Sequence, residues 1–422
     1  DPLARPETKN RLKQNLYALL SDATGQYLPW GTLTGIRPTK IPMKLLEEGW
    51  KNTEIARYMR ETYGVSNEKT ALAITIANRE KALLQDLDYE NGYSLYVGIP
   101  FCPSICLYCS FGSHPLERWT KRVDEYLDTL CKELTFIREQ MGTRKLTTVY
   151  IGGGTPTTLE PEQLRRLLSH IQETFDFTWV KEYTVEAGRP DSITREKLQV
   201  MKEFPVTRIS VNPQTMNQKT LDVIGRKHTV EDTVNIFHMA RELEFDNINM
   251  DLIIGLPGEG KEEVAHTLQE VEKLHPDSLT IHSLALKRAT RLNLFKDKYE
   301  EMSFENSKEI MEMTQQCAGN MGMGPYYLYR QKNIAGNFEN VGYAKVDKAG
   351  IYNILIMEEK QSIVAAGAGA STKVVLPYEI PAPGSKNGRM TNLIRIENVR
   401  DVGEYISRID EMIERKGEWL WH

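Results

Sequence analysis

Long apolar runs are missing from this chain of 422 residues. No hydrophobic stretch approaches the roughly 18 to 20 residues that a bilayer-spanning helix needs, and the first residues do not resemble a signal peptide. Blocks of lysine and arginine are missing too, and the formal net charge is only −5. We therefore expect a cytoplasmic protein without a membrane span and without a nucleic-acid partner.

Cysteine is also scarce. The chain has five cysteines, an odd number, and three of them fall close together at Cys102, Cys106 and Cys109. A disulfide framework does not concentrate its cysteines in this way, so the pattern indicates thiolates that are kept reduced in order to bind metal. The other two, Cys131 and Cys317, lie in helix-like sequence, and we interpret them as small buried side chains.

Apolar sequence is nevertheless sufficient for a large core, because 40% of the residues are hydrophobic and 26% are charged, as in ordinary globular proteins. Residues 1–90 show helical periodicity interrupted by Gly31, Gly35 and Pro38, which predicts a helical lead-in. From Tyr93 the residue pattern changes to short β-rich runs that alternate with longer amphipathic stretches. That alternation is typical of α/β proteins.

Six strands are expected in the second region, each followed by a helix. They lie at residues 94–99, 147–151, 182–186, 207–211, 248–254 and 278–284. Thr229 and Asp232 have the spacing of a helix-starting capping box, and Pro161 suits a first helical turn. Consecutive strand–helix units imply a parallel sheet with right-handed crossovers.

The predicted fold is therefore α/β, a partial (β/α)6 barrel over residues 91–300. The helical segment precedes it, and an α+β capping region over residues 301–422 follows, with a last helix from about Val402 to Lys416. In such a barrel the loops after the strands form the active-site face. Polar and glycine-rich segments stand at those positions, namely 100–112, 152–156, 187–189, 212–214 and 255–258, which predicts an enzyme.

The three clustered cysteines have the spacing Cys-x3-Cys-x2-Cys. Iron–sulfur clusters are bound by thiolates on compact loops, and three protein ligands for four irons leave one iron open to an outside ligand. The alternatives are a zinc site or free buried cysteines. Structural zinc usually takes four ligands in paired arms, and His114 is the one nearby candidate for a fourth ligand.

The segment from Tyr96 to Cys109 resembles the radical S-adenosylmethionine (SAM) superfamily, whose hallmark is this cysteine spacing after a first barrel strand. From Tyr93 to Thr372 the likeness is to the oxygen-independent coproporphyrinogen III oxidase (dehydrogenase) family, which also contains haem chaperones, and residues 33–40 resemble the same branch. The resemblance implies a [4Fe-4S] cluster on the three cysteines and SAM as the second cofactor.

The resemblance further implies SAM contacts at successive strand ends. Glycines permit close approach of the backbone, and the planar fork of an arginine suits the SAM carboxylate. The residues matched in this way are Tyr96, Tyr108, Gly153, Gly154, Thr155, Glu186, Gln214, Arg226, Asp251, Ala285 and Leu328. Singly, each could be an ordinary turn, core or surface residue, but their order along the strands favours the functional interpretation.

In this family a 5′-deoxyadenosyl radical derived from SAM removes a substrate hydrogen. The implied reaction is decarboxylation of two propionates of coproporphyrinogen III to give protoporphyrinogen IX in anaerobic haem biosynthesis, with an electron-donor protein such as a flavodoxin or ferredoxin. A tetrapyrrole with four carboxylates needs cations and flat aromatic surfaces. The candidate substrate residues are Arg288, Arg291, Tyr329 and Arg330, which could instead be solvated or packing residues.

Two positions near the cysteines depart from the family pattern, and Tyr352 and Ser371 stand where relatives often have histidine. Phe111 stands where the oxidases have a further cysteine, and Gly98 stands where they have a histidine. Two other functions therefore remain open, a haem chaperone with the same fold and cluster, and a radical SAM methyl or methylene transferase acting on a haem-like or other aromatic substrate.

Overall fold

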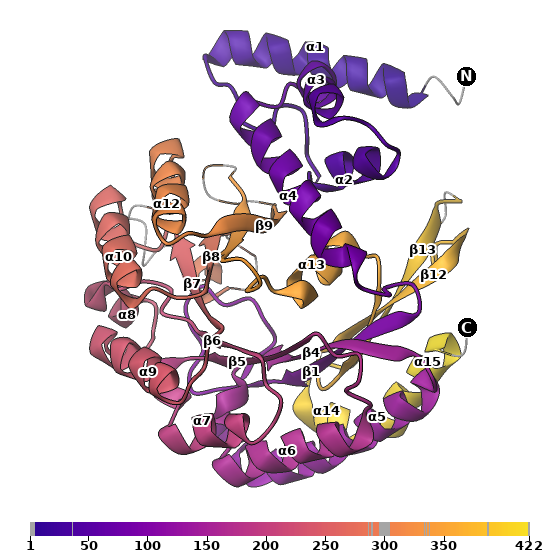
Figure 1. The fold of residues 1–422 in the computed structure, drawn as a ribbon, viewed down its shortest axis with the longest axis vertical. Coiled ribbons are helices and arrows are strands. Elements are labelled where there is room, and N and C mark those ends of the chain that lie inside the picture. Colours follow the sequence, from indigo (N-terminus) through magenta and orange to yellow (C-terminus); the bar gives the residue numbers. More distant parts are fainter. Residues whose placement is uncertain are drawn as a thin grey trace.

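The computed structural model describes residues 5–35, 37–285, 287, 290–294, 304–332, 334, 336, 338–385 and 388–420. Four helices come first, α1 (Arg5–Thr24), α2 (Lys40–Glu47), α3 (Asn52–Tyr63) and α4 (Asn67–Gln85). Figure 1 shows them as a group above the strands, with α4 leading down to the sheet. Among the described residues, no helix is both long and apolar enough to cross a bilayer.

A curved sheet forms the body of the protein. In the described part of the chain it has eleven strands in the order β13-β12-β11-β1-β4-β5-β6-β7-β8-β10-β9. The strands from β11 to β8 in this order are parallel, and the two at each edge are antiparallel. The structure thus has the α/β architecture that the sequence predicts.

The six predicted strands are all present. They are β1 (Gly92–Ile99), β4 (Lys145–Gly153), β5 (Glu182–Gly188), β6 (Arg208–Val211), β7 (Ile248–Ile254) and β8 (Ser278–Ser283). The later strands are β9 (Gly324–Tyr329), β10 (Asn340–Ala344), β11 (Ser362–Ala366), β12 (Ser371–Pro381) and β13 (Met390–Glu397), while β2 (Phe101–Cys102) and β3 (His114–Pro115) form a separate pair. The later strands extend both edges of the same sheet.

Helices cover the outer side of the curve (Figure 1). They are α5 (Val123–Met141), α6 (Pro161–Thr174), α7 (Arg195–Lys202), α8 (Gln218–Val223), α9 (Val230–Glu242) and α10 (Lys261–Leu274). The chain continues through α11 (Arg291–Leu294) and α12 (Lys308–Asn320), while α13 (Ile351–Glu358) packs against β4 and β9 on the inner side. Helix α9 begins with the predicted capping box, since Thr229 and Asp232 bond reciprocally at 3.0 and 2.8 Å. Pro161 is the first residue of α6.

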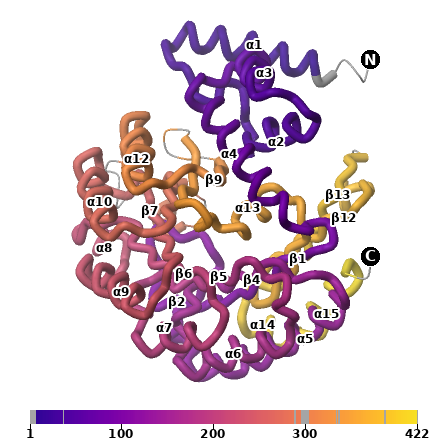
Figure 2. The backbone as a smooth tube through the Cα atoms, viewed as in Figure 1, coloured from indigo at the N-terminus to yellow at the C-terminus, as the bar shows by residue number. Residues whose placement is uncertain are grey.

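The predicted last helix is two helices, α14 (Val402–Ser407) and α15 (Ile409–Leu420), which meet at Arg408. Figure 2 shows this C-terminal segment returning to lie beside α5. Helical periodicity continues through the junction, which explains why the sequence predicts a single element.

The two faces of the parallel strands differ in chemistry. In β4 and β5 the side chains of Val149, Ile151 and Val185 belong to the hydrophobic core. The alternate positions are polar, and they bond to one another across strands, as when Tyr150 donates to Glu186. Successive residues of a strand point to opposite faces, so the inner face of the partial barrel is lined with groups able to bind a polar ligand.

Candidate active site

The cysteine loop, residues 100–113, is fixed by backbone hydrogen bonds from other loops at the same end of the barrel. Leu107 N donates to Ile224 O at 2.9 Å, and Leu292 N donates to Leu107 O at 3.0 Å. The guanidinium of Arg291, a candidate substrate residue, donates to Ile105 O at 3.3 Å. The loop is therefore held between the segments that follow β6 and β8.

Polar side chains approach all three cysteine sulfurs, among them the Ser113 hydroxyl, which lies 3.9 Å from Cys109 Sγ. Cys102 and Cys106 are buried and Cys109 is partly exposed. The Thr155 hydroxyl lies 3.5 Å from Cys102 Sγ, and the Arg189 guanidinium lies 3.6 Å from Cys106 Sγ. Burial raises the pKa of the Cys102 thiol, and the bond from Thr155 opposes that rise. Such donors favour the thiolate that a metal needs.

Arg189 links the cysteine loop to the end of β5, a role that the sequence does not reveal. Its guanidinium forms a two-pronged pair with Asp191 at 2.9 and 2.6 Å and donates to Ser104 O at 2.9 Å. The side chain is almost fully buried. In the sequence, Arg189 stands out only as an arginine directly after a predicted strand. Many surface arginines occupy such positions, so the sequence does not predict its contact with the cysteine loop.

His114 is directed away from the cysteines. Its Nε2 lies 3.2 Å from Arg400 O, and its ring meets Trp119 edge to face at 5.8 Å. Within the residues that the structure describes, no three His, Cys, Asp or Glu side chains are arranged to hold a single metal ion.

The glycine-rich turn after β4 packs directly on the start of the cysteine loop. Gly154 N donates to Ile99 O and Thr155 N donates to Phe101 O, both at 2.7 Å. A Cβ at Gly154 would lie 2.5 Å from Phe101 O, and Gly153 has a φ of +109°. Both positions therefore require glycine, and their backbone is exposed to a ligand on the other side.

Three stacked tyrosines stand on the inner face beside Glu186. The rings of Tyr150 and Tyr352 lie 4.3 Å apart, and Tyr96 is 6.2 Å from Tyr150. The Tyr150 hydroxyl donates to Glu186. Burial raises the pKa of Glu186 to about 7, and Asp251 adds to that rise. Tyr352 comes from α13, far along the chain, and the sequence does not predict that it joins this group.

Asp251, on β7, is the last of a row of polar inner-face side chains that includes Tyr150 and Glu186. Asn249 donates to it at 2.7 Å, and the ring of His282 lies 3.8 Å away. Burial alone would raise the pKa of Asp251, but these neighbours outweigh burial and lower it. Tyr329, a candidate substrate residue, bonds to the other nitrogen of His282 at 3.2 Å. Tyr329 thus lies at the edge of this polar row.

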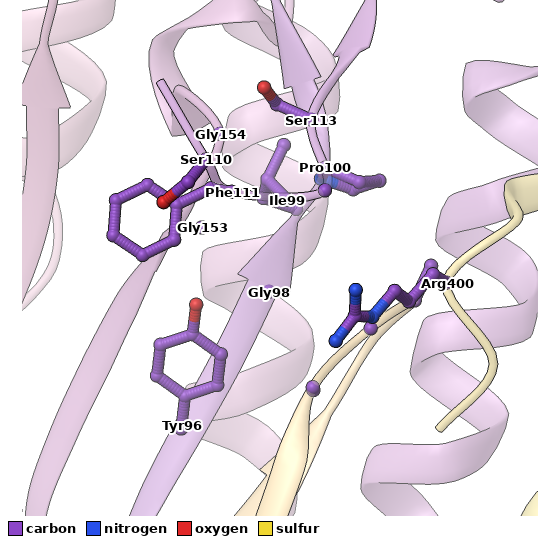
Figure 3. Close-up of a pocket in the computed structure, with 14 residues that line it drawn as sticks. Tyr96, Gly98, Ile99, Pro100, Ser110, Phe111, Ser113, Gly153, Gly154 and Arg400 are labelled. Atoms are coloured by element: carbon purple, nitrogen blue, oxygen red, sulfur yellow. The ribbon is translucent and has the colours of Figure 1, made fainter. Parts of the chain in front are cut away.

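A cavity of about 200 Å³ lies beside the cysteine loop (Figure 3). It is lined by Tyr96, Gly98, Ile99, Pro100, Ser110, Phe111, Gly112, Ser113, Gly153, Gly154, Ala368, Gly369, Ala370 and Arg400. Three of the predicted SAM-binding residues are among these, and the rest of the wall comes from the end of β1, from the cysteine loop and from the segments after β11 and β13.

Known proteins share both sequence and fold with this chain. The family model "Radical SAM superfamily" matches residues 96–271. The "Oxygen-independent coproporphyrinogen-III oxidase-like protein HemZ" of Bacillus subtilis is 41% identical over 418 residues, which is 98% of this chain and 81% of that protein. The chain belongs to the radical SAM superfamily. The cofactors of that superfamily are a [4Fe-4S] cluster and SAM, as the sequence predicts.

More distant relatives of this radical SAM protein share only part of their length with it. "Heme chaperone HemW" of Bacillus subtilis is 37% identical over 47% of this chain and 52% of its own. "Oxygen-independent coproporphyrinogen III oxidase" of Escherichia coli is 31% identical over 58% of this chain and 53% of its own. The chain therefore spans about half the length of these two relatives.

A solved structure supports the fold. The structure described as "Coproporphyrinogen III oxidase (HemN) from Escherichia coli is a Radical SAM enzyme" aligns with a TM-score of 0.59 at 22% identity, covering 81% of this chain and 74% of that one. At this identity the match shows the fold alone. The match therefore confirms the predicted radical SAM barrel as a fold.

The end of the barrel fits the cofactors of a radical SAM protein. Gln214 Oε1 and Arg226 Nε are buried and have no hydrogen-bond partner among the described residues. Arg226 faces the Tyr108 hydroxyl and the Cys106 thiol, and Gln214 N donates to Asp251 O at 3.0 Å. Unpartnered buried polar atoms are costly, so these two are suited to a polar ligand beside the cysteines.

Other predicted residues lie farther from this end or outside the description. Leu328 is fully buried in the main core, and Ala285 pairs with Ile334 through an isolated bridge. Arg330 is buried against the lead-in, where it donates to Leu33 O at 2.8 Å. Arg288 lies outside the described residues. The structure does not bring Leu328 or Arg330 to the cavity.

Proposed function

We propose that this chain is a radical SAM oxidoreductase that decarboxylates propionate side chains of coproporphyrinogen III. The observation that carries the proposal is the cavity between the cysteine loop and the glycine turn, because it brings the two predicted cofactor-binding segments together at one end of the barrel. The name of the Bacillus subtilis relative supports a tetrapyrrole as the substrate class.

The proposed cofactor ligands come from five strands and the segments that follow them, β1, β4, β5, β6 and β7. Cys102, Cys106 and Cys109 would hold the cluster, while the backbone of Gly153 and Gly154 would approach SAM. The remaining predicted contacts to SAM on these strands are Tyr96, Tyr108, Thr155, Glu186, Gln214, Arg226 and Asp251. When bound, the cluster and SAM supply one-electron chemistry that removes a hydrogen atom from an unactivated carbon.

Each propionate would lose one hydrogen atom, one molecule of carbon dioxide and one electron. With SAM held by the residues named above, one hydrogen atom would leave the side chain and be recovered in 5′-deoxyadenosine. Carbon dioxide then leaves with cleavage of the carbon–carbon bond, one electron passes to an external acceptor, and a vinyl group remains. A reduced flavodoxin or ferredoxin would supply the electron that cleaves SAM. Two such events convert coproporphyrinogen III into protoporphyrinogen IX.

The protein's own contribution is to orient the reactants and exclude water. The Tyr96, Tyr150 and Tyr352 stack forms a flat wall on the inner face. Glu186, with its pKa raised to about 7 by burial, can accept or donate a hydrogen bond near neutral pH. A wall that keeps water away protects reactive species from side reactions.

The test is an anaerobic incubation of cluster-reconstituted protein with SAM, a reductant and coproporphyrinogen III, followed by mass analysis. Loss of two carboxyl groups together with formation of 5′-deoxyadenosine is the expected result. Cleavage of SAM with the tetrapyrrole unchanged would contradict the decarboxylase and point to a methyl or methylene transferase with another substrate.

A haem chaperone is the second candidate. Phe111 favours it, because this large apolar side chain is 73% exposed at the cavity and could contact a flat apolar ligand. The haem chaperone relative of Bacillus subtilis is also 37% identical over 198 residues. Stable haem binding without SAM-dependent turnover would support this function instead.

A further inference from the structure

The helical lead-in packs against α13, the helix on the inner side of the barrel. Figure 1 shows α13 beside the lower end of α4. Ile354 and Leu355 of α13 are fully buried in a small hydrophobic cluster that also contains Leu84 of α4 and the nearby Leu87. Because this cluster is separate from the main core, the place of α13 depends in part on the lead-in.

Two cations of the lead-in bind the C-terminal end of α13. Arg37 donates to Met357 O at 2.8 Å. Glu359, the residue directly after the helix, pairs with Arg37 at 2.6 Å and with Lys40 at 2.9 Å. Burial alone would raise the pKa of Glu359, but the bonds from these two cations outweigh burial and lower it to about 2. Both cations come from residues 33–40, the lead-in segment with family resemblance, and cations stabilise the C-terminal end of a helix.

The barrel itself binds the N-terminal end of α13. Ile351 N donates to the carboxylate of Glu182, at the start of β5, and the backbone of Tyr352 bonds to the same carboxylate. Negative groups stabilise the N-terminal end of a helix. Helix α13 is thus held by the barrel at one end and by the lead-in at the other.

Tyr352 is the side chain that α13 brings into the tyrosine stack. Its ring lies 4.3 Å from that of Tyr150 and 6.3 Å from that of Tyr96, and Tyr150 donates to Glu186. Helix α13 has only eight residues, which corresponds to a length of about 12 Å. A movement of its C-terminal end is therefore transmitted directly to the Tyr352 ring.

We infer that Arg37 and Lys40 form a clamp that sets the position of α13 and, through it, the position of the Tyr352 ring in the active site. Both are positioning residues, because they act through α13 and do not line the cavity beside the cysteine loop. The inference rests on the proposed function, in which the tyrosine stack is the wall that orients the reactants. The lead-in is then a working part of the active site and not only an appended domain.

The experiment makes two measurements on anaerobically reconstituted holoprotein. In Arg37→Gln, hydrogen–deuterium exchange of the α13 amides should become about tenfold faster, as expected for loss of a charge-assisted interaction, while exchange in α10 stays as in wild type. With SAM, a reductant and coproporphyrinogen III, the amount of decarboxylated product per 5′-deoxyadenosine should fall several-fold, because misplaced reactants make SAM cleavage unproductive.

Two further variants separate the clamp from a general loss of stability. Arg37→Lys should restore both values in part, because a lysine can still pair with Glu359. Arg57→Gln is the matched control, since Arg57 is exposed on α3 of the same lead-in, and it should match wild type in both measurements. If Arg37→Gln does not fold, Lys40→Gln removes the more exposed of the two cations and is judged by the same criteria.

The outcomes distinguish this inference from the proposed function. Unchanged exchange of α13 in Arg37→Gln would overturn the clamp and leave the proposed function intact. Faster exchange with an unchanged product ratio would overturn the positioning of Tyr352, because the contact would then serve stability alone. If wild-type protein forms no decarboxylated product, the proposed function fails, and the exchange rates of α13 still support or overturn the clamp.

Discussion

Lys416 and Glu133 form an ion pair in the protein interior, where the side chains of both residues are fully buried. Glu133 also accepts hydrogen bonds from Gly367 N at 2.8 Å and from the Tyr405 hydroxyl at 2.6 Å. Lys416 donates a second bond to Ala365 O at 2.5 Å. The pair therefore joins α5 and α15 to the loop that lines the cavity.

Lys416→Met should destabilise the protein by about 3 to 5 kcal/mol, because it leaves the Glu133 carboxylate buried without its countercharge. The free energy of unfolding in urea under anaerobic conditions measures the effect. Lys308→Met is the control, since Lys308 pairs with Glu68 on the surface, where ion pairs contribute little. Equal stability of the two variants would contradict the importance of the buried pair.

Glu186→Gln should make stability less dependent on pH. The folded pKa of Glu186, about 7, is above its ordinary value of 4.5, so the folded protein binds this proton more tightly than the unfolded chain does. The resulting stabilisation is complete below about pH 4.5 and is lost as the pH rises through 7. Relative to wild type, the unfolding midpoint of Glu186→Gln should therefore gain about 2 °C or more between pH 5 and pH 8.

The matched control for this pH effect is Glu196→Gln on α7, where the glutamate is exposed. Its midpoint should follow that of wild type at both pH values. A Glu186→Gln midpoint that also follows wild type throughout would show that Glu186 titrates as an ordinary surface carboxylate.

Gly154→Ala should disturb the cysteine loop, because the new methyl group would meet Phe101 O at 2.5 Å. Overpacking of this kind costs about 1 to 3 kcal/mol, and we expect less iron and sulfide per chain after anaerobic reconstitution. Gly319→Ala in α12 has open space around the position and should leave the iron content unchanged. Full cluster content in Gly154→Ala would mean that the turn can move away from the loop.

Single replacement of Cys102, Cys106 or Cys109 by alanine should remove most of the bound iron and the associated absorption. Cys131→Ala is the control, because Cys131 lies on α5, outside the cysteine loop. Iron and sulfide assays on anaerobically purified protein measure the outcome. Unaltered iron in all three variants would contradict the assignment of these residues as ligands.

The sequence predicts the parts of the fold that depend on local pattern. The strand from Ile248 to Ile254 is an apolar and β-branched run interrupted only by Asn249 and Asp251, and the capping box at Thr229 is a four-residue signal. The Cys-x3-Cys-x2-Cys spacing and the glycine turn at Gly153 are likewise local. Such features follow from residue type and spacing alone.

The remaining features depend on contacts between distant segments. Tyr352 reaches Tyr150 only because α13 packs over the inner face, and Arg400 reaches the cavity only through pairing with the loop at Gly369. Neither position carries a short motif. The division at residues 90 and 300 and the roles of the individual site residues stay predictions.

Strand β11 lies beside β1 although about 270 residues separate them, with Tyr93 opposite Ser362 and Val97 opposite Ala366. A fragment that stops before Ser362 would leave one edge of β1 without its hydrogen-bonding partner. Exposed strand edges promote aggregation. The barrel strands are therefore not a separable module, and we expect a truncated chain of this kind to accumulate as insoluble material instead of as a smaller working enzyme.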